Sequence, residues 1–193
     1  MMKKTMFLAL AAWVVGSAFV APTPAARLQN GYAVQTATSR VEFVGTKGNG
    51  YHTGFFNLKG GQVMVNNGKI SGGEFTIDLT SLKVTDEGGG EKLEGHLKNK
   101  DFFETSVNTE ARYTVTGVKY INEDVCEISG NLSMKGITAP VTLQAMVRGL
   151  DDKRLFAQAN FSIDRTVWGI NYGVAKGGIS KDVQVSIFLF ANK

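Results

Sequence analysis

The sequence has little of the chemistry on which most metalloproteins and thiol enzymes depend. Its 193 residues include one cysteine, Cys126, and two histidines, His52 and His96. A single cysteine excludes an internal disulfide and any metal site built on several thiolates. Two histidines leave little material for a zinc site or for a nucleophile paired with a base. We therefore predict no metal site, no cofactor and no catalytic residues.

Proline and charge are also scarce. The chain has 3 prolines against 23 glycines and 12 phenylalanines, a composition typical of strands joined by tight turns. Charged residues make up 20% and hydrophobic residues 43%, which argues against a disordered chain. No stripe of lysine and arginine with interleaved aromatic residues indicates nucleic-acid binding. The length fits one domain.

The first 25 residues have the pattern of a secretory signal peptide. Lys3 and Lys4 precede an apolar run from Met6 to Val20, and small residues and prolines follow it. The run is shorter than the roughly 20 residues of a membrane span, which favours a signal peptide over an uncleaved anchor. We expect cleavage after Ala18 or Ala25, an exported protein and no stable membrane span after cleavage. Loss of two lysines leaves a net charge of +2 in place of +4.

Two-residue alternation of apolar and polar side chains dominates residues 31–193. Such alternation is typical of strands with one face toward a core and one toward water. The clearest segments are residues 74–80, 127–134, 141–148 and 155–164. Turn signals at Asn66-Asn67-Gly68, Lys135-Gly136 and Asp151-Asp152-Lys153 predict antiparallel hairpins. A change of apolar parity near Gly117 predicts a β-bulge.

These patterns predict one all-β domain over residues 31–193. The expected fold is a single antiparallel, lipocalin-like β-barrel of about eight to ten strands, because closure removes exposed strand edges. The segment Glu91–Phe103, which follows Gly88-Gly89-Gly90, has a weak helical stripe and predicts a short helical cap over one barrel end. In the last strand, Phe188 and Phe190 fall on the outer face. We expect the helix, a loop or a second subunit of a homodimer to cover them.

A barrel of this size is either filled by side chains or holds one small ligand. The small inward residues Ala145, Ala157, Ala159 and Gly130 favour a cavity, and a solid core stays the alternative. The candidate ligand-binding residues are the large side chains assigned to the inner face, together with residues of the cap and of the turn after residue 164. They are Phe43, Phe75, Ile77, Leu79, Leu97, Phe102, Phe103, Tyr113, Leu132, Met134, Leu143, Phe161, Ile163, Arg165, Trp168, Val185 and Ile187.

Three polar or aromatic residues need individual interpretation. Arg165 keeps the parity of Phe161 and points inward, so it must pair with an acid, contact a phosphate-type head group or reach water at the strand end. His96 lies near Asp101 and is interpreted as a structural histidine that fixes the cap. Trp168 lines the cavity or plugs one end.

Three segments are similar to motifs of the YceI-like family. They are Glu94–Phe103, with its His-Leu and Asp-Phe-Phe elements, the hairpin Gly130–Leu143, and the turn Phe161–Ile170, with Arg165, Trp168 and Gly169. The resemblance runs from about Gly31 to the C-terminus. It implies an exported, periplasmic barrel that holds a long isoprenoid tail, such as that of a prenyl quinone or a polyprenyl phosphate.

Three functions follow as hypotheses. The first is a carrier or reservoir for an isoprenoid lipid, with no covalent chemistry. The second is an enzyme that acts on such a lipid through His96 and Asp101, which the lack of a nucleophile–base–orienter set disfavours. The third is a ligand-free structural or stress adaptor that uses Phe188 and Phe190 as an interface.

Overall fold

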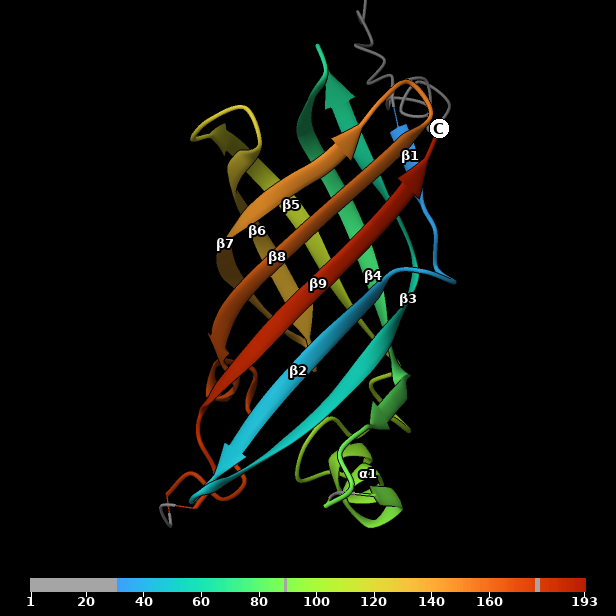
Figure 1. The fold of residues 1–193 in the computed structure, drawn as a ribbon. Coiled ribbons are helices and arrows are strands. Elements are labelled where there is room, and N and C mark those ends of the chain that lie inside the picture. The colour runs from blue at the N-terminus through green and yellow to red at the C-terminus, as the bar shows by residue number, and fades with distance from the viewer. Residues whose placement is uncertain (1–30, 89, 176–177) are drawn as a thin grey trace, which may run out of the picture.

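The computed structural model describes residues 31–88, 90–175 and 178–193, which form nine strands, one α-helix and a 3₁₀ turn (Figure 1). The predicted signal peptide lies outside these residues. The elements are β1 Gly31–Val34, β2 Arg40–Lys47, β3 Gly50–Asn66, β4 Lys69–Val84, α1 Gly90–Lys98, β5 Glu110–Tyr120, β6 Val125–Met134, β7 Ile137–Leu150, β8 Arg154–Asp164, η2 Arg165–Trp168 and β9 Asp182–Asn192. The prediction of an all-β fold with one short helix is confirmed.

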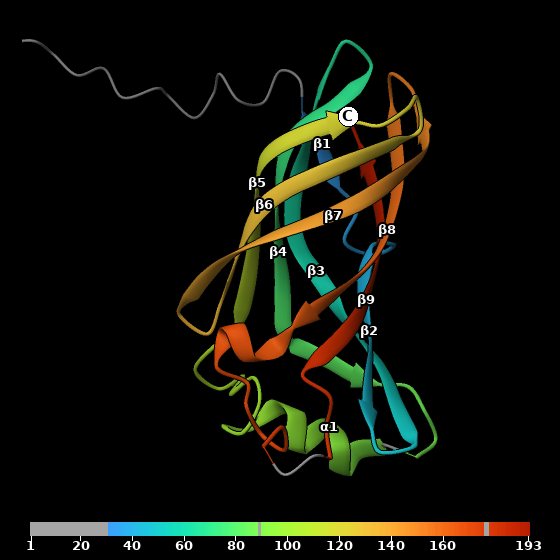
Figure 2. The same ribbon diagram turned by 90° about the vertical axis from the view of Figure 1, so that its left-hand side faces the viewer.

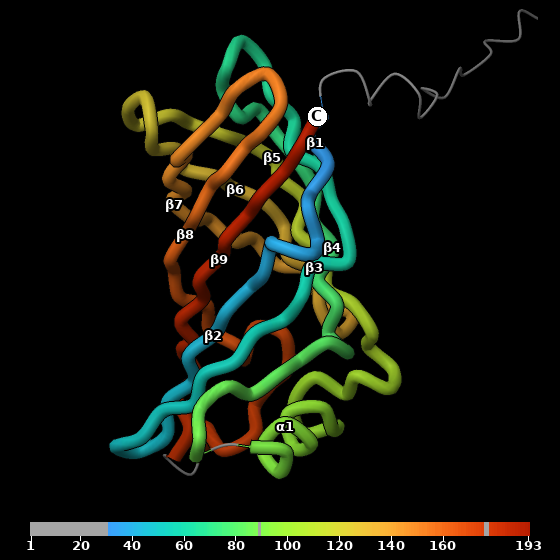
Figure 3. Tube along the Cα trace, turned by 45° about the vertical axis from the view of Figure 1, so that its right-hand side comes forward, coloured from blue at the N-terminus to red at the C-terminus, as the bar shows by residue number. Residues whose placement is uncertain are grey.

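The strands close into an antiparallel barrel. The sheet order is β1-β3-β2-β9-β8-β7-β6-β5-β4, and pairing of β3 with β4 closes the ring. The short β1 pairs with β3 and β9, as β2 does further along, so the two strands share one position in the wall (Figure 3). All pairings between these strands are antiparallel, as the alternation and the turn signals predict.

The hairpin turns form where the sequence predicts them. Asn67 and Gly68 have φ angles of 50° and 71°, and Lys135 and Gly136 have 51° and 75°. Two consecutive left-handed residues match the twist of the flanking strands, which is why Asn-Gly and similar pairs are favoured there. The predicted bulge is present as a register shift between Val115 and Gly117 in β5.

Strand β3 is longer than the sequence predicts. The sequence pattern by itself favours two short strands, His52–Leu58 and Gln62–Val65, but one strand runs through both, with an irregularity between Leu58 and Gly60. Gly61, at a φ of 152°, brings the backbone close to the carbonyl oxygen of Glu74. Gly60 and Gly61, whose sequence suggests a break between two strands, therefore form a bend within one strand.

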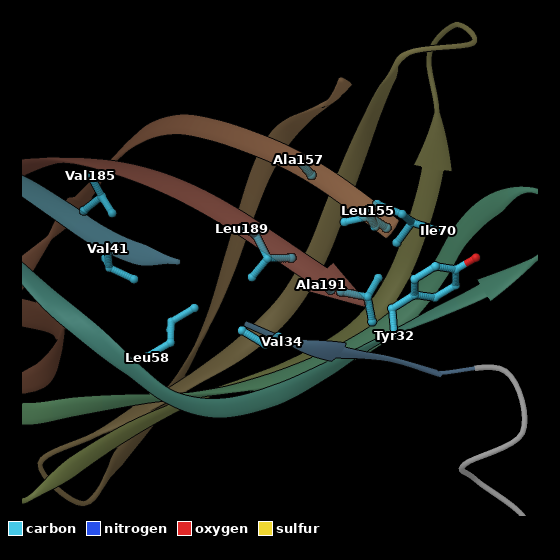
Figure 4. Packing of buried hydrophobic residues seen from close by; sticks show 11 residues of the cluster. Tyr32, Val34, Val41, Leu58, Ile70, Leu155, Ala157, Val185, Leu189 and Ala191 are labelled. Atoms are coloured by element: carbon cyan, nitrogen blue, oxygen red, sulfur yellow. The ribbon is translucent and has the colours of Figure 1, made fainter. Parts of the chain in front are cut away.

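Buried side chains close the barrel at the end that holds β1. Tyr32, Val34, Leu155 and Ala191 are at most 8% exposed and point into the barrel together with Ile70 (Figure 4). The Tyr32 hydroxyl donates a hydrogen bond of 2.7 Å to the carbonyl oxygen of Asp151 in the β7–β8 turn. This end of the lumen is filled by the protein itself.

Helix α1 lies beneath the opposite end of the barrel, as the predicted cap (Figure 2). Its Glu94 contacts Lys98 at 2.8 Å and Lys83 of β4 at 3.3 Å, which ties the helix to the barrel wall. The helix stops at Lys98, and turns continue to Phe103, so the cap is less helical than its stripe suggests. In the described ranges, no helix has the length and apolar character needed to cross a membrane.

Of the three expected covers for the outer face of β9, the helix is excluded, because α1 lies at the opposite end of the barrel from the C-terminal end of β9 (Figure 1). Phe190 stacks on Phe156 of the neighbouring strand, with ring centroids 4.4 Å apart and an interplanar angle of 14°. Phe188 is half-buried and lies opposite Arg40 of β2. Coverage by a second subunit stays a prediction.

Candidate functional site: an apolar cavity with a basic end

The barrel encloses a cavity of about 450 Å³. This volume falls within the ~300–1,000 Å³ of typical ligand pockets. Nearly all of its wall consists of aliphatic and aromatic side chains from the inner faces of the strands, with Leu93 and Leu97 of α1 added at one end. The space is thus suited to an apolar ligand.

The structure brings nearly all the predicted ligand residues together on this wall. Those that line the cavity are Phe43, Phe75, Ile77, Leu79, Leu97, Phe102, Phe103, Tyr113, Leu132, Met134, Leu143, Phe161, Ile163, Arg165, Val185 and Ile187. Two-residue alternation predicts this set correctly, because every second residue of a barrel strand faces the lumen. Their part in binding a ligand stays a proposal.

Trp168 is the predicted residue that does not line the cavity. It is 2% exposed and packs in η2 among buried residues that include Phe102 and Ile170. Its indole Nε1 donates a hydrogen bond of 3.0 Å to the carbonyl oxygen of Leu132. Trp168 therefore packs against residues of the cavity wall without lining the cavity itself. Beyond Asp164 the chain leaves the strand conformation, so two-residue alternation no longer predicts which side chains point into the barrel.

The small residues only partly account for the vacant space. Ala145, Ala157 and Ala159 lie on the cavity wall, as expected. Gly130 leaves no space, because the Tyr113 phenol occupies the position that a side chain would take. The Tyr113 hydroxyl donates a hydrogen bond of 3.0 Å to the carbonyl oxygen of Val141, and burial raises the pKa of Tyr113 to about 12. The expectation for Gly130 is wrong, and Tyr113 is a neutral wall residue.

Most polar side chains of the cavity wall lie at the end near α1, and Tyr113 of β5 and Gln158 of β8 are the exceptions. Thr46 and Lys47 come from the end of β2, His52 from β3 and His96 from α1. Arg165, Tyr172 and Ser180 come from η2 and the segment that follows it. Lys47 and Tyr172 are exposed residues, so the cavity reaches the protein surface here. We call this set the basic end.

Arg165 is buried at the basic end, with 5% exposure. Its Nε donates to the carbonyl oxygen of Ser180 at 2.9 Å, and its Nη1 donates to that of Ile170 at 2.6 Å. Its Nη2 donates to the carbonyl oxygens of Tyr172 at 2.9 Å and of Ile179 at 3.5 Å. Burial lowers the pKa of Arg165, but a guanidinium stays protonated at neutral pH.

The expected partners of Arg165 were wrong in two respects. It does not reach water at the strand end, and in the described residues it forms no ion pair with an acid. Its partners are backbone carbonyl oxygens of residues that follow no helix or strand periodicity. No sequence motif could therefore have indicated these contacts. Arg165 fastens residues 170–172 and 179–180 to the end of β8.

Each histidine at the basic end is paired with an aspartate. His52 Nδ1 lies 2.8 Å from Asp86 Oδ2, and His96 Nε2 lies 3.1 Å from Asp101 Oδ2. Burial by itself raises the pKa of Asp86, but hydrogen bonds from His52 and from the Thr53 amide bring it below 3.8. The His96 ring also packs edge-on against the rings of Phe102 and Tyr172, at 5.1 Å and 4.8 Å.

The hydrogen-bond partner of each histidine side chain in the described residues is its aspartate. Within the described residues, no serine, threonine or cysteine is hydrogen bonded to either histidine. No group of three or more metal-ligating residues was found in the same ranges. Sequence reasoning did not identify Lys47 and Tyr172 as cavity residues or Asp86 as the partner of His52, because contacts between residues far apart in sequence leave no periodic pattern.

A carboxylate next to this site gives a pH-dependence prediction. The ammonium of Lys181, 2.7 Å away, and two hydrogen bonds from Thr166 lower the pKa of Asp164 to about 2, from 3.8. A lowered pKa in the folded state means that the carboxylate stabilises the fold above about pH 3.8 and loses this effect as the pH falls toward 2. Asp164→Asn is therefore expected to destabilise the protein at neutral pH, and the difference from the parent is expected to shrink over that window.

Urea unfolding midpoints of the parent and of Asp164→Asn, measured from neutral to acid pH, check this prediction. Asp152→Asn, at an exposed turn position, is the control and should show no such convergence. A constant difference between the parent and Asp164→Asn would contradict the assigned role of the carboxylate.

Comparisons with known sequences support one family. The family model described as the YceI-like domain matches residues 32–191. The protein YceI of Escherichia coli is 38% identical over 77 residues, which cover 40% of this chain and 38% of that protein. A UPF0312 protein of Shewanella baltica is 28% identical over 149 residues, which cover 77% of this chain and 75% of the relative. The chain thus matches well under half the length of the Escherichia coli protein.

Solved structures share the fold at low sequence identity. Burkholderia cenocepacia BcnA superimposes with a TM-score of 0.72 at 21% identity, and covers 82% of this chain and 99% of its own. A polyisoprenoid binding domain from Saccharophagus degradans gives 0.68 at 23% identity, and covers 83% of this chain and 97% of its own. At these identities the likeness demonstrates a common fold alone.

Proposed function

The chain belongs to the YceI-like domain family, and from this premise we propose that it is a binding protein that holds the tail of a long-chain isoprenoid lipid. The observation that carries the proposal is the cavity, which is apolar along the barrel, filled at the β1 end and open to the surface near α1. A cavity with one apolar length and one polar end fits a molecule with a single tail and a polar head.

Burial of the tail supplies the affinity. Each methylene-sized group removed from water contributes about 0.8 kcal/mol, so several isoprene units bind tightly with few hydrogen bonds. The polar residues of the basic end then serve to orient the head group, which is a quinone ring or a phosphate. The polyisoprenoid-binding relative from Saccharophagus degradans, of the same fold, supports the choice of an isoprenoid over other apolar chains.

The proposed role is transport or storage of the lipid after export to the periplasm. The signal-peptide pattern of residues 1–25 supports export. A carrier has a role after export, because an apolar lipid needs one to cross an aqueous compartment. The His52–Asp86 and His96–Asp101 pairs are assigned structural roles at the basic end rather than catalysis. Binding without covalent chemistry is thus the function that the site supports best.

Native lipid extraction tests the proposal. The full chain is expressed with its own N-terminus, purified from the exported fraction without detergent, and its organic extract is analysed by mass spectrometry. We expect one prenyl compound per protein chain. Protein that carries no prenyl compound, and that also takes up no added geranylgeraniol, would exclude the carrier function and favour the adaptor.

A further inference from the structure

We infer that the lumen has a second opening, in the barrel wall between β4 and β5, and that the far end of a long isoprenoid tail leaves through it. This inference rests on the proposed function, since it concerns the tail of the same lipid. The opening, called the side window below, lies between residues 71–73 of β4 and residues 115–119 of β5. It allows the protein to hold tails that are longer than its lumen.

The two strands that border the side window pair along only part of their length. Their register pairs end at Glu74 and Thr114. β4 continues to Lys69 and there pairs with β3 alone, and β5 continues to Tyr120 and there pairs with β6 alone. The turns at the ends of the β3–β4 and β5–β6 hairpins lie apart (Figure 1, Figure 3). Over this stretch the wall therefore has no ladder that joins β4 to β5.

Irregularities in the neighbouring strands account for the divergence. β5 contains the register shift between Val115 and Gly117. The register of β3 with β4 also shifts, between Met64 and Val65, directly beside the side window. Such bulges bend a strand and increase its local twist. The two hairpins are thus turned away from each other by their own sequences.

One side-chain contact rejoins the strands beyond the side window. The Tyr120 hydroxyl accepts a hydrogen bond of 2.7 Å from the Ile70 amide, and the Lys69 ammonium lies 4.9 Å from the centre of the Tyr120 ring. Between this bridge and the last register pair, the five residues 115–119 of β5 face the three residues 71–73 of β4. Segments of unequal length cannot stay in ladder register, so the backbones separate between the two fixed points.

The cavity reaches the side window. Ile70 and Gly72 of β4 and Val115 of β5 line it. Gly72 is the informative residue, because it pairs with Met64, whose neighbour Val63 is buried and faces the lumen. Gly72 therefore belongs to the outer face of the sheet. A residue of the outer face can line the lumen only where the wall is interrupted.

The rims of the side window leave it open and do not invite another strand. At Gly72 a Cβ would have only Met64 within 4 Å, at 3.8 Å, so the space beside this residue is vacant. The exposed Lys69 and Lys119 flank the two unpaired strand edges. Lysines and bulges are the devices that protect a strand edge from pairing with another chain. The interruption is thus better suited to passage of an apolar chain than to sheet extension.

The length of the tail supplies a reason for the opening. At about 30 Å³ for each group of the size of a water molecule, the cavity of about 450 Å³ holds about 15 carbon-sized groups, or about three isoprene units. A longer tail cannot continue along the axis, because Tyr32, Leu155 and Ala191 fill the β1 end. Ile70 belongs both to this filled end and to the cavity wall. The side window therefore lies where the axis is blocked.

A second gap in the wall is less suited to this role. β7 and β8 stop pairing at Ala145 and Ala159, and the neighbouring Gln158, on the outer face, lines the cavity. This gap runs along β8 toward η2, away from the filled end at Leu155. A tail would therefore pass it before reaching the blocked end. The gap serves as the internal comparison for the test.

A reactive group at the end of the tail locates the exit. Nonaprenol and farnesol each carry a maleimide at the end opposite the hydroxyl, so the two probes differ in tail length alone. Delipidated full-length protein takes up each probe, and binding is measured by co-elution in gel filtration. Attachment to an introduced cysteine is followed by mass spectrometry of the intact protein. The parent supplies the background rate, because its Cys126 is buried.

Two cysteine variants compare the openings. Ser71→Cys places a thiol at an exposed position between two wall residues of the side window, and Gln144→Cys places one at an exposed position beside the second gap. We expect the nonaprenyl probe to label Ser71→Cys at least about tenfold faster than Gln144→Cys, because a bound tail holds its maleimide near the thiol at a high effective concentration. The farnesyl probe, whose end stays inside the lumen, should label both variants slowly. Excess geranylgeraniol should suppress the fast reaction.

Other results overturn the inference or its premise separately. Faster labelling of Gln144→Cys would place the exit at the second gap. Faster labelling of Lys47→Cys, at the open end near α1, would mean that the tail folds back inside the barrel. Either result, equal labelling of Ser71→Cys by both probes, or a bound nonaprenyl probe that labels no variant would overturn the side window and leave the carrier function intact. Failure of both probes to bind would reject the carrier function itself.

Discussion

Replacement of Arg165 by methionine is expected to lower the free energy of unfolding by about 3–5 kcal/mol, the usual cost of removing one partner from a buried polar cluster. The substitution keeps an unbranched apolar stem but leaves the carbonyl oxygens of Ile170, Tyr172 and Ser180 without their donor. Each buried acceptor without a partner costs about 1–3 kcal/mol. Ile170, Tyr172, Ile179 and Ser180 line the cavity at the basic end, so loss of these hydrogen bonds also opens the cavity on that side.

Urea denaturation with circular dichroism measures this loss. Arg154→Met is the matched control, because the Arg154 side chain is 78% exposed, and the expected change is within about 0.5 kcal/mol. Arg165→Lys should fall between the parent and Arg165→Met, since an ammonium keeps the charge but cannot reach all the carbonyls from one planar fork. If Arg165→Met were as stable as the parent, the hydrogen bonds from Arg165 to these carbonyl oxygens would not stabilise the fold.

The barrel follows from the sequence because one local rule repeats around it. In β8, Ala157, Ala159 and Phe161 sit at alternate positions and reach the cavity, and Asn160, between the last two, is exposed. Such alternation specifies the register strongly, since a shift by one residue would turn every apolar side chain to water. Local turn chemistry at Asn67-Gly68 and Lys135-Gly136 then fixes which strands are neighbours.

The basic end does not follow from the sequence in the same way. Arg165 is bonded to carbonyls that lie 5–15 residues further along the chain, in a segment without strand or helix period. His52 and Asp86 are 34 residues apart and meet only after β3 pairs with β4. Contacts of this kind depend on the closed barrel, so residue types and spacing give no direct signal for them.

Gly130 leaves no vacant space and Trp168 does not line the cavity for the same physical reason. Parity gives the side of the sheet on which a residue lies but not the volume that its neighbours occupy. The Tyr113 ring fills the space beside Gly130, and the chain turns into η2 before Trp168. Whether the lumen is vacant is thus a property of packing, which the sequence pattern leaves open.

A phenylalanine in place of Ala159 should abolish binding of the isoprenoid tail while the barrel stays folded. Ala159 lies on the cavity wall, is paired with Ala145 of β7 and lies opposite Ile187 of β9. A ring at this position occupies vacant volume in the lumen and excludes the part of the tail that passes there. Loss of about four methylene-sized contacts, at about 0.8 kcal/mol each, corresponds to roughly a 200-fold weaker affinity.

Stability separates a blocked cavity from a damaged fold. Since the added ring enters empty space, we expect the free energy of unfolding to stay within about 1 kcal/mol of the parent, unlike overpacking of a filled core, which costs about 1–3 kcal/mol. Ser162→Phe is the control: it places the same ring on the same strand at an exposed position and should leave geranylgeraniol binding unchanged. Unchanged binding in Ala159→Phe would mean that the tail does not enter the barrel at this level, whereas a strong loss of stability would mean that the lumen is already filled there.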